Sequence, residues 1–251
     1  YERVRGVYYQ MDFMLDEDKL IARMCIYNPS EKTVPMYWWS NIATPEFEGG
    51  RVIVPADSAY NNSDGTGIAK SSIPFDRGVD VSYPERIPNT IDYFYDIPDE
   101  NKKFIANVDK NGKGLLQYST KRLKGRKLFS WGHIQGSKHW QEFLTDKAGD
   151  YVEIQAGLGK TQYECIPMPP NTTWSWTECY TGVQLDNPVD SDYAVLVSDI
   201  DAKVNTEKLE KINLYMAENV AFEKGEMIWH GHGWGYLNNL IHKNAPEHLE
   251  F

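Results

Sequence analysis

The sequence predicts a mainly β protein, a β-sandwich with a helical appendage at its C-terminal end. Most of the first 200 residues form short runs in which apolar and polar residues alternate, as in strands with one buried face. Aromatic residues, which favour strands, make up 13% of the chain. Residues 205–224 instead repeat apolar side chains at helical spacing. Strands followed by helices indicate a sandwich over residues 1–200 and a helical extension over 201–251.

The first strands are expected in pairs. Residues 4–13 and 20–27 flank an acidic turn and predict a hairpin. Further strands are expected at 34–42, which contains Tyr37-Trp38-Trp39, and at 51–55. Residues 56–104 are rich in Asp, Asn, Ser, Gly and Pro and have little periodicity, which predicts a functional loop or a covering excursion.

The second half of the sandwich is expected to contain strand after strand. Residues 104–108 and 114–119 flank the turn Asp109-Lys110-Asn111-Gly112 and predict another hairpin. Residues 123–180 read as short strand-like runs, and the alternation at 173–178 places Trp174 and Trp176 on one face. The last strand is expected at 194–197.

The C-terminal part is expected to be helical. In residues 205–224, apolar side chains recur at helical intervals, Asn205 is a plausible N-cap and Gly225 a plausible stop. A second helical segment is expected at 233–243.

Composition restricts the classes of function. The net charge of −10 and the isoelectric point of about 5.1 argue against nucleic acid as a partner. The chain contains no apolar run of the roughly 18 residues that would suggest a membrane span. Its three cysteines have no CxxC spacing and fit free thiols. We expect a cytoplasmic protein; because Tyr1 is not an initiator methionine, the chain starts at a cut end, and secretion stays open.

The segment 123–180 carries the clearest functional signal. It contains four tryptophans, two histidines and several glutamates in short runs. Aromatic faces can stack on the C–H faces of a sugar ring while carboxylates accept hydrogen bonds from its hydroxyls. This combination predicts a site for a sugar or an oligosaccharide.

Several blocks in order resemble a known bacterial family, and they extend over nearly the whole chain. They are MYWWSNIATPE (36–46), RVIVPA (51–56), GRKLFSWG (125–132), HWQEFL (139–144), YVEIQAGLGKTQYECIPMP (151–169) and GHGWGYL (231–237). These blocks resemble the DUF5107 family, a domain of unknown function often followed by tetratricopeptide repeats. The resemblance implies a galactose-mutarotase-like β-supersandwich, of which this chain is expected to form the later part.

A more remote resemblance, to aldose-1-epimerase-like enzymes, suggests a chemistry. Their late strand has two hydrophobic residues followed by Glu-x-Gln, and its glutamate is the catalytic base. Tyr151-Val152-Glu153-Ile154-Gln155 fits this pattern, so the resemblance implies a base role for Glu153. An earlier block of these enzymes contains a histidine acid and an asparagine; here Asn41 matches, but the histidine is absent, which puts plain mutarotase activity in doubt.

The candidate site residues follow from these two lines of reasoning. Glu153 is the expected base, and His139 the expected acid, with a surface histidine as the alternative reading. The residues expected to contact a substrate are Trp131, Trp140, Gln155, Tyr37, Asn41 and Glu178. No cofactor is expected. No metal is expected either, because His230-Gly231-His232 lies in a Gly-rich turn without nearby cysteines.

The sequence thus supports two functions. The first is a carbohydrate-active or carbohydrate-binding domain that acts at the anomeric centre through Glu153. The alternative is a non-catalytic sugar-binding or scaffolding module attached to protein-binding helical repeats, with the C-terminal helical region as a possible surface for a protein partner.

Overall fold

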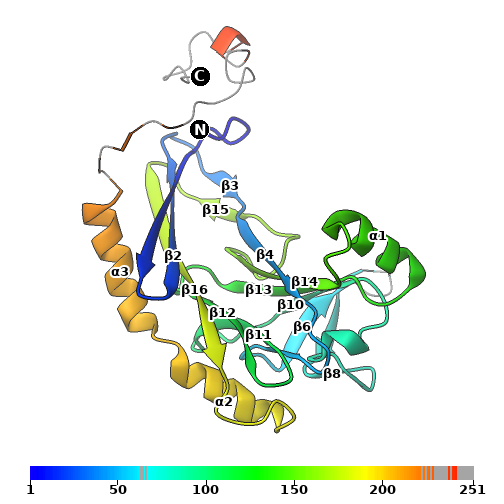
Figure 1. Cartoon of the computed structure of the whole chain (residues 1–251). Helices are drawn as coiled ribbons and strands as arrows, with labels where there is room; N and C mark the ends of the chain where they lie inside the picture. Colours follow the sequence, from blue (N-terminus) through cyan, green and yellow to red (C-terminus); the bar gives the residue numbers. More distant parts are fainter. Residues whose placement is uncertain are drawn as a thin grey trace.

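Two six-stranded antiparallel sheets form the body of the protein in a computed structural model (Figure 1). The structure describes residues 1–62, 65, 67–221, 223, 225–226, 228, 237 and 239–241. Sheet 1 has the order β1 (Tyr8–Asp16), β2 (Lys19–Asn28), β16 (Thr172–Gln184), β12 (Lys113–Ser119), β11 (Lys103–Val108) and β5 (Arg51–Ile53). Sheet 2 has the order β4 (Trp39–Pro45), β14 (Tyr151–Gly157), β13 (Gly125–Ser130), β10 (Ile91–Tyr95), β6 (Ser58–Asn61) and β7 (Ala69–Ser72).

The main core lies between the two sheets. Ile105 of sheet 1 packs in one buried cluster with Leu128 and Ile154 of sheet 2, and Trp176 of sheet 1 packs in another with Ala156 of sheet 2. Two separate two-stranded sheets accompany them: β3 (Val34–Met36) with β15 (Ile166–Met168), and β8 (Phe75–Asp76) with β9 (Val79–Asp80). A 3-10 turn, η1, spans Pro84–Arg86. The predicted mainly β sandwich is confirmed.

Two helices cover the outer face of sheet 1. Leu196 and Ile200 of α2 (Tyr193–Lys203) and Leu209 and Met216 of α3 (Thr206–Asn219) are buried against that sheet (Figure 1). The Asn205 side chain caps α3 as expected, by accepting a hydrogen bond from the Lys208 amide. The layers are therefore helices, sheet 1 and sheet 2, and neither of these two helices covers the outer face of sheet 2.

Four expectations about individual elements are wrong. Residues 135–145 form helix α1 (Gln135–Thr145) rather than strands, because apolar side chains recur there at i, i+3 and i+4 and Asp146 closes the helix in the left-handed conformation. Residues 194–197 belong to α2, whose start is fixed by the Asp192 side chain accepting from the Ala194 amide. Helix α3 ends at Asn219, before the expected stop at Gly225.

The fourth correction concerns residues 56–104, which contain strands β6, β7 and β10 of sheet 2. These strands have only four or five residues each, which is too short for a clear period, and the last three residues of β10 are all buried. The helical segment expected at 233–243 and the His230-Gly231-His232 motif fall mostly or wholly outside the described residues. Residue 200, the expected boundary between the two parts, lies within α2.

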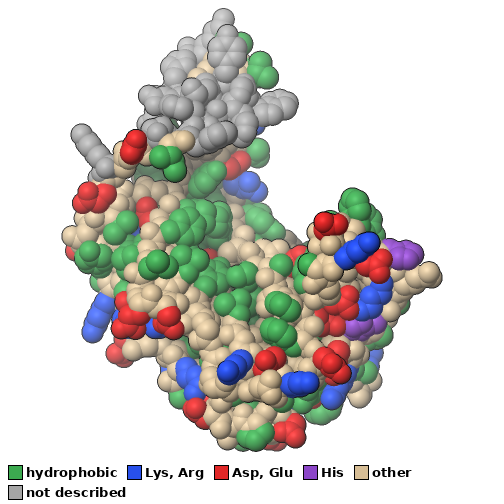
Figure 2. Space-filling view, in the orientation of Figure 1, with side chains coloured by type: hydrophobic (Ala, Val, Ile, Leu, Met, Phe, Trp, Pro, Cys, Tyr) green, Lys and Arg blue, Asp and Glu red, His purple; other side chains and the backbone are tan. Residues whose placement is uncertain are grey.

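Strand β1 leaves an apolar strip at the edge of sheet 1. The alternating residues Tyr9, Met11, Phe13 and Leu15 are all exposed, Leu15 to 75%. Figure 2 shows hydrophobic side chains gathered over this part of the molecule, and a recess between that part and the projecting α1.

Among the described residues, no helix is long and apolar enough to cross a membrane.

Candidate functional site

Glu153 lies in the middle of β14, on the outer face of sheet 2. Its neighbours Val152 and Ile154 are buried in the core between the sheets, as the alternation predicts. Glu153 therefore points to the opposite face and is half-buried there. The flanking strands β13 and β4 place Phe129 and Ala43 directly beside it.

Two side-chain amides hold the Glu153 carboxylate. The amide nitrogens of Asn41 and Gln155 donate to Glu153 Oε2 over 2.6 and 2.9 Å. Asn41 and Gln155 are also direct cross-strand partners, so all three side chains share one face. Three of the predicted site residues thus converge, and both amides donate to the same oxygen, so Glu153 Oε1 keeps its acceptor capacity for a ligand.

The polar network continues across sheet 2 through residues that the sequence reasoning missed. Gln162 donates to Gln155 Oε1 over 3.1 Å and accepts from the ammonium of Lys127 over 2.9 Å. Lys127 is almost fully buried and forms an ion pair with Asp92 at 2.8 Å. The chain of contacts therefore places one cation and a second carboxylate on the face that carries Glu153. Lys127 could have been found from the alternation of residues 125–130, but its pairing with Gln155 depends on strand register.

Aromatic rings border this network on two sides. Phe129 packs edge-on against Trp131 at 4.9 Å between ring centroids, and Trp131 packs against Tyr151 at 6.2 Å. Across the network, Phe94 contacts the rings of Trp39 and Tyr163. We call the face formed by Asn41, Glu153, Gln155, Lys127, Phe129 and Trp131 the Glu153 face. Its combination of a carboxylate, amides and aromatic edges suits a polyhydroxylated ligand.

Two other predicted residues, His139 and Trp140, lie on α1 and do not join this network. Both are exposed, Trp140 to 56%, and Trp140 contacts only the ring of Phe143 among the aromatic residues that the structure describes. Helix α1 projects from the end of sheet 2 (Figure 1). The structure therefore does not bring the expected acid to the expected base.

Glu178 belongs to β16 of sheet 1 and is buried in the interior between the two sheets, whereas Glu153 lies on the outer face of sheet 2. Its Oε2 accepts hydrogen bonds from Ser40, Gln117 and Tyr180, at 2.6, 2.8 and 2.8 Å. Ser40 is the neighbour of Asn41 in β4, and adjacent strand residues point to opposite faces. Glu178 therefore faces the interior between the sheets, while Asn41 and Glu153 face outward.

Tyr37 is exposed between β3 and β4 and has no described hydrogen bond to the Glu153 face. Burial raises the pKa of its phenol, and the electrostatic effect of the nearby Cys165 raises it further. Tyr37 thus lies just before the start of β4, the strand that carries Asn41.

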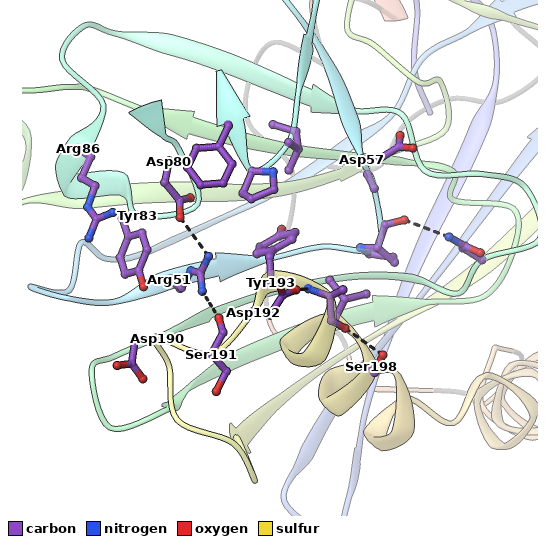
Figure 3. A pocket seen from close by; sticks show the side chains of 18 of the residues that line it. Arg51, Asp57, Asp80, Tyr83, Arg86, Asp190, Ser191, Asp192, Tyr193 and Ser198 are labelled. Atoms are coloured by element: carbon purple, nitrogen blue, oxygen red, sulfur yellow. Dashed lines mark hydrogen bonds and ion pairs between the residues drawn. The ribbon is translucent and has the colours of Figure 1, made fainter. Parts of the chain in front are cut away.

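A cavity of about 760 Å³ lies elsewhere, beside α2 and η1 (Figure 3). Its most buried cation, Arg51, forms an ion pair with Asp80 at 3.1 Å, donates to Ser82 and to two backbone carbonyls, and lies over the Tyr83 and Tyr193 rings. These contacts tie the chain before α2 to β5. The volume suits a small molecule, but the cationic head of Arg51 is engaged by the protein itself, so we place the candidate site at the Glu153 face.

Comparison with known proteins supports the fold. A family model described as a domain of unknown function, DUF5107, matches residues 2–172. A crystal structure of a TPR-domain containing protein from Parabacteroides distasonis superposes with a TM-score of 0.61 at 21% identity, covering 76% of this chain and 32% of that one. A galactose mutarotase-like protein from Clostridium acetobutylicum superposes with a TM-score of 0.52 at 11% identity, covering 71% and 56%. The chain thus covers less than two thirds of either relative.

Proposed function

Since the chain belongs to the DUF5107 family and has a galactose mutarotase-like fold, we propose that its Glu153 face binds a sugar. The observation that carries this proposal is the placement of Glu153. Its carboxylate is half-buried, held by two neutral amides and bordered by aromatic rings. Such a carboxylate can accept hydrogen bonds from sugar hydroxyls while Trp131 and Phe129 contact apolar ring faces.

We further propose that Glu153 acts as a base at the anomeric centre. Its amide partners fix the orientation of the carboxylate, and positioning of this kind is needed before proton transfer can be efficient. Taking the proton of the anomeric hydroxyl would open the ring, and the ring oxygen would need a proton from an acid. His139 can serve as that acid only if α1 moves toward the Glu153 face.

The alternative is a non-catalytic sugar-binding module. The observation in its favour is that, within the described part of the chain, Glu153 accepts hydrogen bonds only from amides and has no acidic partner. The similarity to a TPR-domain containing protein suggests that such a module could be attached to helical repeats that bind protein. In that case sugar recognition would serve to position a partner protein.

Polarimetry and binding measurements separate the two functions. We would follow the mutarotation of α-D-galactose and α-D-glucose, and measure binding of the same sugars by calorimetry. If Glu153 is a base, the wild type accelerates mutarotation and Glu153→Gln abolishes the acceleration while the fold is kept. The control is Glu142→Gln, an exposed glutamate of α1, which should behave as the wild type.

The results have distinct readings. Binding without acceleration in the wild type favours the non-catalytic module. Acceleration that survives in Glu153→Gln would refute the base role, and the absence of both binding and acceleration with free sugars and oligosaccharides would refute the sugar site.

A further inference from the structure

We propose that Glu46, His133 and Asp150 form a binding site for a divalent metal ion of the Zn²⁺ or Mn²⁺ class. One donor atom from each residue lies within 4.8 Å of the others. The three residues come from separate segments: Glu46 follows β4, His133 lies between β13 and α1, and Asp150 precedes β14. No spacing motif in the sequence reveals them, because they are brought together only by the pairing of these strands.

The backbone fixes the three segments. The amide of Glu46 donates to the carbonyl of Asp150 over 3.0 Å, and the amide of His133 donates to the carbonyl of Pro88 over 2.9 Å. Gly132 has a φ of +67°, and a Cβ there would lie 2.5 Å from the Asn89 backbone, so a glycine is needed at this position. The backbone at the three residues is therefore tied to neighbouring segments, which favours a preorganised set of donors.

Two donor atoms in this cluster are buried without a hydrogen-bond partner. They are Glu46 Oε2 and His133 Nε2, and the Glu46 side chain is only 4% exposed. Glu46 Oε1 lies 3.1 Å from His133 Nε2, within ion-pair distance, but His133 Nε2 still has no hydrogen bond of acceptable geometry. Leaving a buried carboxylate oxygen unpaired is costly. A metal ion between the two residues would satisfy both atoms.

The donor set and the local charge both suit a cation. One imidazole nitrogen and two carboxylates are ligands that Zn²⁺ and Mn²⁺ accept, with open positions left for water or a ligand. A third carboxylate, that of Glu85, is close enough to affect the pKa of Glu46. The lysine that opposes this charge is Lys138, which contacts one oxygen of Asp150 but is about one third exposed and can turn to water.

The experiment uses the full chain after treatment with EDTA. Zn²⁺ and Mn²⁺ are titrated separately, by calorimetry and by thermal unfolding, into the wild type, Glu46→Gln and His133→Gln. The matched control is Glu48→Gln, an exposed glutamate two residues from Glu46. Because His230 and His232 could bind metal independently, a background with both changed to Gln is measured as well.

The proposal expects one saturable site in the wild type and in the His230/His232 background. Glu46→Gln and His133→Gln should each weaken it at least 10-fold, Glu48→Gln should leave it unchanged, and Lys138→Gln should retain or tighten it. Circular dichroism checks that every variant is folded. Absence of saturable binding in the wild type, loss of binding in the His230/His232 background, or wild-type affinity in Glu46→Gln would each overturn the proposal.

Discussion

Replacing Glu178 by alanine should strongly destabilise the fold, because this carboxylate anchors a buried polar cluster. Its Oε2 accepts hydrogen bonds from Ser40, Gln117 and Tyr180, and the residue is 4% exposed. An unsatisfied buried donor costs about 1–3 kcal/mol. The negative charge also offsets the burial of Arg126, whose guanidinium pKa is lowered to about 10 by desolvation. Because the two hydroxyls can reorient, we expect a loss of about 3–5 kcal/mol rather than the full sum.

The measurement is the free energy of unfolding from urea titration at pH 7, with the slope compared to confirm two-state behaviour. Glu178→Gln keeps an acceptor oxygen and should lose less than Glu178→Ala. Glu142→Ala, an exposed position on α1, should change stability by no more than about 0.5 kcal/mol. A loss below about 1 kcal/mol in Glu178→Ala would refute the assignment of Glu178 to the interior.

Three further predictions concern charge, surface and core. Burial lowers the pKa of Lys103 from 10.5 to about 8, a difference that corresponds to about 3 kcal/mol. The unfolded chain therefore binds more protons than the native one above pH 8, and stability should rise with pH from about 8. Between pH 7 and 9.5, below the range in which the tyrosines of the unfolded chain lose their protons, thermal unfolding should show this rise in the wild type and a flatter profile in Lys103→Met. Phe13→Lys, on the exposed strip of β1, should change the free energy of unfolding by no more than about 0.5 kcal/mol. It should also reduce self-association measured by light scattering, because a lysine on an edge strand opposes pairing with another chain. Unchanged association would contradict the view of β1 as an open edge. Trp176→Ala, at a fully buried position, should lower the free energy of unfolding measured in urea by about 3–5 kcal/mol. A change near zero would contradict the burial of Trp176 between the two sheets.

Much of the fold and part of the site were predictable because they depend on local patterns. The alternation Val152-Glu153-Ile154 predicts which side chain leaves the core, and helical spacing with an Asn205 cap predicts α3. The strands β6 and β10 were not predicted, because four or five residues are too few for a clear period and β10 ends in three consecutive buried residues.

Which side chains meet at the site depends on the register between paired strands and on the sheet that each strand joins. Neither can be predicted from sequence periodicity. Gln155 meets Asn41 and Lys127 only because β14 pairs with β4 and β13 in one particular register. Glu178 resembled a site residue in sequence, yet its strand belongs to the other sheet and directs it inward. His139 was expected to act as the acid because it neighbours Trp140, but both residues lie exposed on helix α1, which the sequence pattern did not predict.

The most direct test of the account is the affinity of the wild type and of Glu153→Ala for a sugar, measured by calorimetry with a panel of free aldoses and oligosaccharides. A hydrogen bond to a charged group contributes about 1.5–3 kcal/mol, which corresponds to about a 10- to 100-fold change in Kd. We predict saturable binding by the wild type and a loss of this size in Glu153→Ala, with circular dichroism confirming that the variant is folded. Equal Kd values in the two proteins would contradict the claim that the Glu153 face is the sugar site.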